Sequence, residues 1–125
     1  MKALIIEDEY PAAERLIKLI HKADASIEIL AVLDSIEAAK RWFLSHPAPD
    51  LIFSDIQLSD GLSFVIFEEI DIKSPIIFTT SYDEYAIKAF KVNGIDYLLK
   101  PVEPEDLEKA IQKAKNISKS QSKSH

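Results

Sequence analysis

The chain contains no cysteine, two glycines and three histidines among its 125 residues. Without cysteine it cannot form disulfides, use a thiolate nucleophile or bind zinc through sulfur. The histidines His21, His46 and His125 are scattered, so a site with three histidine ligands is not expected. Any chemistry must therefore depend mainly on oxygen groups and lysine.

Long apolar runs and an excess of basic charge are also missing. No run approaches the ~20 residues that a membrane-spanning helix needs, and the acidic residues at 7–9 interrupt the apolar region that a signal peptide would require. Fifteen basic residues against 21 acidic ones give a net charge of −6, which repels a phosphate backbone. We therefore expect a cytoplasmic protein that binds neither membranes nor nucleic acid directly.

The composition is that of one folded domain. Hydrophobic residues make up 47% and charged residues 29% of the chain, which are ordinary proportions for a globular protein. After Asn116 the sequence becomes rich in serine, lysine and glutamine. We predict a domain over residues 1–116 and, over 117–125, a flexible polar tail or the start of a linker to an output domain.

Five short apolar runs alternate with segments of helical periodicity. The runs are nearly continuous, as in strands buried on both faces, and they cover residues 3–6, 29–33, 51–53, 76–78 and 97–99. Helices are expected to begin near Pro11, Asp34, Ser63, Asp83 and Pro104. This alternation predicts an α/β fold of the flavodoxin-like class, a doubly wound five-stranded parallel sheet of order 2-1-3-4-5 with helices on both faces.

Charged and polar residues follow four of these strands. Glu7 and Asp8 follow the first strand, Asp55 the third, Thr80 the fourth and Lys100 the fifth. Because the carboxyl ends of parallel strands meet at one edge, we expect these groups to converge. Three carboxylates together favour a bound cation, and oxygen ligands favour a hard ion such as Mg²⁺.

Each group also has an ordinary structural explanation. An acidic run after a strand is more often a solvated loop, Asp55 alone could be a turn residue, and Thr80 and Lys100 could each simply end a strand. Asp34, which follows the outer second strand, is interpreted as a helix cap. The functional interpretation therefore depends on the convergence of several strand ends.

Four motifs resemble, in order and spacing, the receiver domain of two-component response regulators. They are Leu-Ile-Ile-Glu-Asp-Glu at 4–9, Phe-Ser-Asp-Ile-Gln at 53–57, Phe-Thr-Thr-Ser-Tyr-Asp-Glu-Tyr-Ala at 78–86 and Asp-Tyr-Leu-Leu-Lys-Pro at 96–101. The resemblance extends over most of the chain. The Tyr-Asp-Glu-Tyr-Ala run and the compact loop after residue 55 are most similar to receivers of LytTR-type (LytR/AlgR) transcriptional regulators.

The resemblance implies a role for each converging residue. Asp55 would be the phosphoacceptor, Lys100 would pair with the phosphoryl group, and Thr80 and Tyr97 would be the switch hydroxyl and the switch aromatic. A hard divalent ion, Mg²⁺ in particular, would be held by Asp8, by Asp55 and by the backbone carbonyl of Gln57.

The sequence departs from the commonest family pattern in two places. The first acid is Glu7 rather than aspartate, so it is expected to reach the ion through a water molecule. The loop after Asp55 lacks the frequent proline and is shorter, and Gly61 is expected to adopt a positive φ in it. Gly94 is expected to end the fourth helix, and Lys100–Pro101 resembles the cis peptide of the family.

The implied function is a signalling switch, with no enzymatic activity beyond its own phosphorylation and dephosphorylation. A sensor histidine kinase would supply the phosphoryl group, and the switch would control an attached DNA-binding output domain outside this sequence. Lys88, Lys91, Glu105 and Glu108 take outer positions on the fourth and fifth helices. Their mixed charges fit a symmetric homodimer interface through the fourth helix, the fifth strand and the fifth helix, and fit a solvated surface equally well.

Three other functions fit the sequence less well. A flavodoxin-like electron carrier needs a phosphate-binding loop where this chain has acids at 7–9. A phosphatase with an aspartate nucleophile needs a second acid at the position of Gln57. A degenerate receiver that serves only as an interaction module is disfavoured because the acids, the hydroxyl and the lysine named above are all present.

Overall fold

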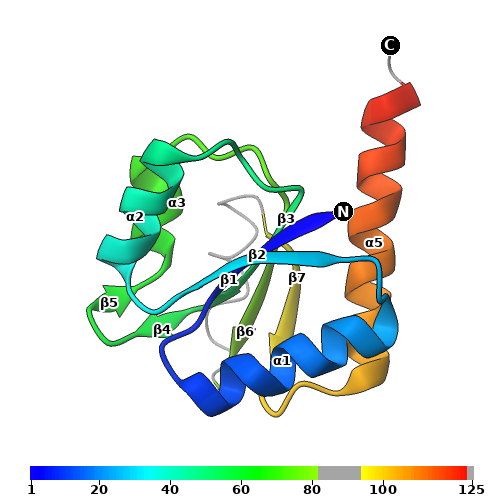
Figure 1. Cartoon of the computed structure of the whole chain (residues 1–125), viewed down its shortest axis with the longest axis horizontal. Coiled ribbons are helices and arrows are strands. Elements are labelled where there is room, and N and C mark those ends of the chain that lie inside the picture. The colour runs from blue at the N-terminus through cyan, green and yellow to red at the C-terminus, as the bar shows by residue number, and fades with distance from the viewer. Residues whose placement is uncertain (82–93, 124–125) are drawn as a thin grey trace.

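A five-stranded parallel sheet lies at the centre of the molecule (Figure 1). The computed structural model describes residues 1–81 and 94–123. Within them the sheet contains β1 (Lys2–Ile6), β2 (Glu28–Leu33), β3 (Leu51–Asp55), β6 (Ile76–Thr80) and β7 (Gly94–Leu99). Their order is β2-β1-β3-β6-β7. Strands β4 and β5 form a separate ribbon, so β6 and β7 are the fourth and fifth strands of this sheet. The order is therefore the predicted flavodoxin-like 2-1-3-4-5, and the fold class is confirmed.

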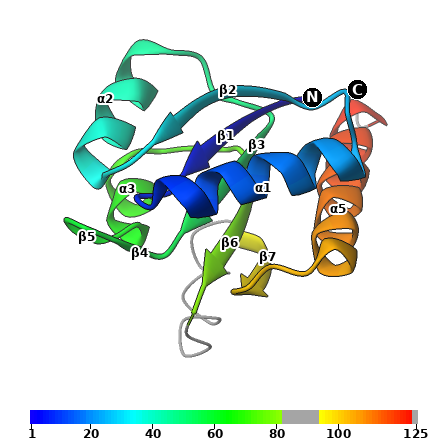
Figure 2. The same cartoon turned by 60° about the horizontal axis from the view of Figure 1, so that its bottom comes forward.

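Helices cover both faces of the sheet (Figures 1 and 2). In the described part of the chain, α1 (Tyr10–Ala23) and α5 (Pro104–Lys123) lie on one face, and α2 (Ile36–Ser45) and α3 (Phe64–Glu69) lie on the other. The predicted fourth helix, with Lys88 and Lys91, falls outside the described residues. None of the described helices combines the length and apolarity needed to cross a membrane.

The strands send alternate side chains into two apolar layers. Phe53 and Ile77 pack beneath α1 and α5, whereas Ile52 and Phe78 pack with Phe64 beneath α2 and α3. Each large side chain that is fully buried stabilises the fold by about 1.5–3 kcal/mol. Burial on both faces explains why the strands read as continuous apolar runs.

Two features of the chain differ from the sequence predictions near the site. The strands β3 and β6 extend to Asp55 and Thr80, because these polar residues are themselves buried at the strand ends. The connection after β3 contains a short antiparallel ribbon that was not predicted, formed by β4 (Gln57–Leu58) and β5 (Gly61–Leu62). The predicted positive φ of Gly61 is confirmed at 135°.

Two helix ends also differ from expectation. The N-cap of α2 is Ser35, whose Oγ accepts a hydrogen bond from Ala38 N at 3.0 Å, so the prediction of Asp34 as the cap is wrong. The backbone of α5 stays helical to Lys123, across part of the segment predicted to be flexible. No glycine or proline interrupts α5 after Pro104. The domain boundary at residue 116 remains a prediction.

Candidate functional site

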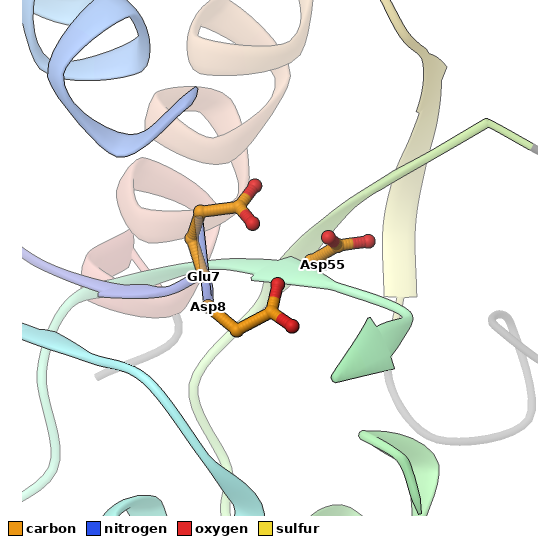
Figure 3. Close-up of side chains that lie close together, drawn as sticks. All are labelled: Glu7, Asp8 and Asp55. Carbon is orange, nitrogen blue, oxygen red and sulfur yellow. The ribbon is translucent and has the colours of Figure 1, made fainter. Parts of the chain in front are cut away.

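Three carboxylates lie close together at the carboxyl edge of β1 and β3 (Figure 3). One oxygen each of Glu7, Asp8 and Asp55 lies within 4.8 Å of the others. The two strands pair in parallel, with Ile6 opposite Ser54, so the residues that follow them emerge side by side. The strand order therefore brings together the three acids that the sequence analysis selected.

Lys100, at the end of β7, joins two of these carboxylates. Its Nζ donates to Glu7 Oε1 at 2.7 Å and to Asp55 Oδ2 at 2.9 Å. Partial burial disfavours the charged ammonium, but the two hydrogen bonds and the negative charge of their acceptors outweigh it and raise the pKa of Lys100. The lysine is therefore held as a cation in direct contact with Asp55. The peptide bond that follows it, Lys100–Pro101, is cis.

Glu7 and Asp8 differ in how their carboxylates are engaged. Glu7 is 4% exposed, and besides Lys100 it accepts a hydrogen bond from Glu9 N, through Oε2 at 3.1 Å. Burial raises the pKa of Asp8, and the neighbouring Glu7 raises it further. Among the residues that the structure describes, three carboxylates at this strand edge face one lysine, which leaves an excess of negative charge. Such an oxygen-only donor set fits a hard divalent cation.

Asp55 is 7% exposed and has a partner for each of its oxygens. While Oδ2 accepts from Lys100, Oδ1 accepts from Gln57 N at 3.3 Å. Gln57 begins the β4–β5 ribbon, so the expected carbonyl ligand lies in a segment that is hydrogen-bonded to the Asp55 side chain. The carboxylate and the ribbon are thus fixed to one another.

Thr80 and Tyr97 lie on the face of the sheet that α2 and α3 cover. Thr80 is buried at the end of β6 and pairs with Leu99. Tyr97 pairs with Phe78 and is half-buried against the apolar layer beneath α2 and α3. Because alternate residues share a face, Thr80, Phe78 and Tyr97 point to the same side of two neighbouring strands.

Two residues near the site were not identified from the sequence. Thr79 pairs with Asp55 and lines a cavity of about 180 Å³ together with Glu7 and Lys100. Arg15 of α1 lines the same cavity, and its Nη1 donates to Val102 O at 3.0 Å. Alternation along β6 could have placed Thr79 beside the acids, whereas no sequence pattern indicates the contact of Arg15.

Comparisons with known proteins agree with this arrangement. The response regulator receiver domain family matches residues 3–112. The sensory transduction protein LytT of Bacillus anthracis is 36% identical over 124 residues, which cover 97% of this chain and 50% of that protein. LytR of Streptococcus agalactiae is 37% identical over 123 residues, covering 94% of this chain and 49% of that protein.

A solved structure is similar over almost its whole length. The response regulatory domain of mrkE from Klebsiella pneumoniae superposes with a TM-score of 0.84 at 29% identity and covers 96% of this chain and 99% of that one. The chain spans about half the length of the curated relatives it matches. Since the family match includes all five strands of the sheet and the residues at its carboxyl edge, the chain belongs to the response regulator receiver domain family, with LytT- and LytR-type relatives.

Proposed function

We propose that the chain is a phosphorylation-dependent switch of a two-component system, in which Asp55 accepts a phosphoryl group from a sensor histidine kinase in a Mg²⁺-dependent reaction. The observation that carries this proposal is the position of Lys100 Nζ, 2.9 Å from Asp55 Oδ2 and 2.7 Å from Glu7 Oε1. A buried carboxylate that already contacts a cation is suited to receive a dianionic group.

Phosphoryl transfer mainly requires that the reacting groups are held in position and that the charge on the phosphoryl oxygens is balanced. An oxygen of Asp55 attacks the phosphorus of a phosphohistidine, and the new P–O bond forms as the P–N bond breaks. The electron pair of the broken bond stays on the imidazole nitrogen, which takes up a proton from water. Lys100 balances the charge on the phosphoryl oxygens.

A divalent ion would be held by Asp8, by Asp55 and by the carbonyl of Gln57. Glu7 would reach it through water, because both of its oxygens already accept hydrogen bonds from protein groups. When bound, the ion supplies further positive charge next to the phosphoryl oxygens. The oxygen-only donor set and the excess negative charge support this assignment.

Thr80 and Tyr97 would transmit the modification to the surface. A phosphoryl group on Asp55 adds strong acceptor oxygens, toward which the Thr80 hydroxyl would move to donate a hydrogen bond. Tyr97 would fill the space that Thr80 leaves. Their common face on β6 and β7 supports this coupling. The two arrangements must differ by only a few kcal/mol for one modification to shift the population.

The switch would act in the cytoplasm on a DNA-binding output domain attached to this chain. The double length of the curated relatives supports the presence of such a further domain. Glu105 and Glu108 are exposed on α5, where the expected homodimer would form. Lys88 and Lys91, the other residues expected there, lie outside the described residues.

Intact mass spectrometry tests the proposal. After incubation with an acyl phosphate and Mg²⁺, the wild-type chain is expected to gain one phosphoryl group, and Asp55→Asn none. Asp34→Asn, which changes an exposed aspartate after a different strand, is the matched control and should gain one group. Phosphorylation of Asp55→Asn, or an unchanged yield after chelation of Mg²⁺, would contradict the proposal.

A further inference from the structure

The β4–β5 ribbon is too short to be stable by itself. It contains two residue pairs, Gln57 with Leu62 and Leu58 with Gly61, and even longer isolated two-stranded ribbons are only marginally stable in water. Yet it carries Gln57, whose carbonyl is a ligand in the proposed function. The position of that carbonyl must therefore be fixed by contacts outside the ribbon.

Asp60, at the tip of the ribbon, makes two of these contacts. Its Oδ1 accepts from Ile36 N at 2.9 Å and its Oδ2 accepts from Glu37 N at 3.3 Å, in the first turn of α2. The hydrogen bond from Ile36 N is the main cause that lowers the pKa of Asp60, so the carboxylate stays ionised. The tip is thus attached to a helix 24 residues earlier in the chain.

Packing reinforces this attachment. Leu58 is buried in the same apolar cluster as Ile36. Gly61 approaches Ile36 so closely that an added Cβ would lie 3.2 Å from Ile36 Cδ1. Strand β5 therefore lies against the start of α2, and β4 adds Leu58 to the apolar cluster that contains Ile36.

The Asp60 contact is additional to the local cap of α2. Ser35 already accepts the amide of Ala38 through its own side chain, whereas Asp60 takes the amides of Ile36 and Glu37. Both residues stabilise the helix terminus, but only Asp60 connects it to the ribbon. Ser35→Ala and Asp60→Ala are therefore a matched pair of variants. Each removes hydrogen bonds to the first turn of α2, but of the two only Asp60→Ala also removes a link to the ribbon.

We infer that Asp60 is a positioning residue for the divalent cation, because its hydrogen bonds to α2 hold the ribbon where the Gln57 carbonyl can bind the ion. The inference rests on the proposed function. Helix α2 contributes no proposed ligand, but through Asp60 it would help to hold the ribbon that carries one.

Magnesium titrations followed by NMR amide shifts test this role. We expect Asp60→Ala to weaken Mg²⁺ binding by about tenfold, as for other residues that orient a ligand, and Ser35→Ala to change it by less than about twofold. Unchanged affinity in Asp60→Ala, or an equal loss in Ser35→Ala, would overturn the inference. If Asp60→Ala does not fold, Asp60→Asn replaces it; because it keeps one oxygen, a smaller weakening is expected, and wild-type affinity would again overturn the inference.

Hydrogen exchange gives a second readout. Because coupling between sites is reciprocal, Mg²⁺ should slow exchange of the Ile36 and Glu37 amides in the wild type, and this slowing should be lost in Asp60→Ala and reduced in Asp60→Asn. No slowing in the wild type would contradict the inference.

Variants of the acids separate this inference from the proposed function. Asp8→Ala should lose Mg²⁺ binding, and Glu9→Ala, in which the backbone N–H to Glu7 remains, should keep it. If Asp8→Ala binds like the wild type, the metal assignment in the proposed function is wrong. If Asp8→Ala loses binding but Asp60→Ala does not, only the role of Asp60 is wrong.

Discussion

The pKa values of Asp8 and Lys100 both lie above their ordinary values, for opposite reasons. For Asp8, burial and a neighbouring carboxylate disfavour the charged form. For Lys100, two carboxylate acceptors favour the charged form in spite of burial. The free site therefore stabilises positive charge and holds excess negative charge, which are the conditions under which a cation binds.

The raised pKa of Asp8 leads to a prediction for stability. An acid with a raised pKa in the fold lowers the free energy of unfolding at pH values above that pKa, and this loss disappears as the pH falls through it. Asp8→Asn should therefore raise the free energy of unfolding at neutral pH by roughly 0.5–1 kcal/mol, while weakening cation binding.

Urea unfolding at two pH values would measure this effect. The gain from Asp8→Asn should vanish below about pH 3, where an ordinary aspartate is also protonated. Asp34→Asn, at an exposed position after the neighbouring strand β2, should show no such gain at neutral pH. Lower stability of Asp8→Asn at neutral pH would contradict the prediction.

Among the elements, the β4–β5 ribbon depends most on one residue conformation. Gly61 has φ of 135°, a region that other residues rarely adopt, and a side chain there would press on Ile36. We expect Gly61→Ala to lower the free energy of unfolding by about 1–3 kcal/mol in urea titrations. Ser59→Ala, at an exposed position of the same turn, should have little effect.

The strands β6 and β7 allow a test of the switch. When a phosphoryl mimic binds, the NMR signals of the Tyr97 ring should shift in the wild type, because in the proposed switch Thr80 would move away from the face that it shares with Tyr97. In Thr80→Ala, Asp55 should still be phosphorylated but the Tyr97 signals should not shift. The same shift in both proteins, or none in the wild type, would refute this coupling.

The elements also show which parts of the structure a sequence pattern can reveal. Continuous apolar runs marked all five strands of the sheet, because burial on both faces leaves a strong signal. The same reasoning ended β3 and β6 too early, since buried Asp55 and Thr80 carry no apolar signal. It also missed the ribbon β4–β5, because strands of two residues have no periodicity.

The site was predictable to the extent that strand ends determine it. Parallel pairing alone brings Glu7, Asp8, Asp55 and Lys100 to one edge. The contact of Asp60 with α2 was not predictable, because Asp-Gly in a loop is equally typical of a turn and the hydrogen bonds connect distant parts of the chain.

At the scale of the whole molecule, the expected homodimer can be tested by sedimentation. A phosphoryl mimic should increase the dimer fraction of the wild type. Glu108→Lys, on the exposed face of α5, should weaken association by roughly 0.5–2 kcal/mol, because two symmetric contacts of about 0.2–1 kcal/mol each are lost.

A charge reversal on the opposite face is the control for this experiment. Glu68 is exposed on α3, so Glu68→Lys changes the net charge equally but should leave association unchanged. Equal weakening by both variants would indicate a general charge effect, and an unchanged dimer fraction with the mimic would refute phosphorylation-dependent dimerisation.

The groups around Asp55 come from both the first and the last strand of the sheet, and this affects when the site can form in a newly made chain. Lys100 lies 93 residues after Glu7, so at about 5–20 residues per second a ribosome adds it roughly 5–20 s later. Until then the acids lack their lysine, and β6 lacks its neighbour β7. The contacts of Lys100 with Glu7 and Asp55 can therefore form only after β7 has been made, late in the synthesis of this domain.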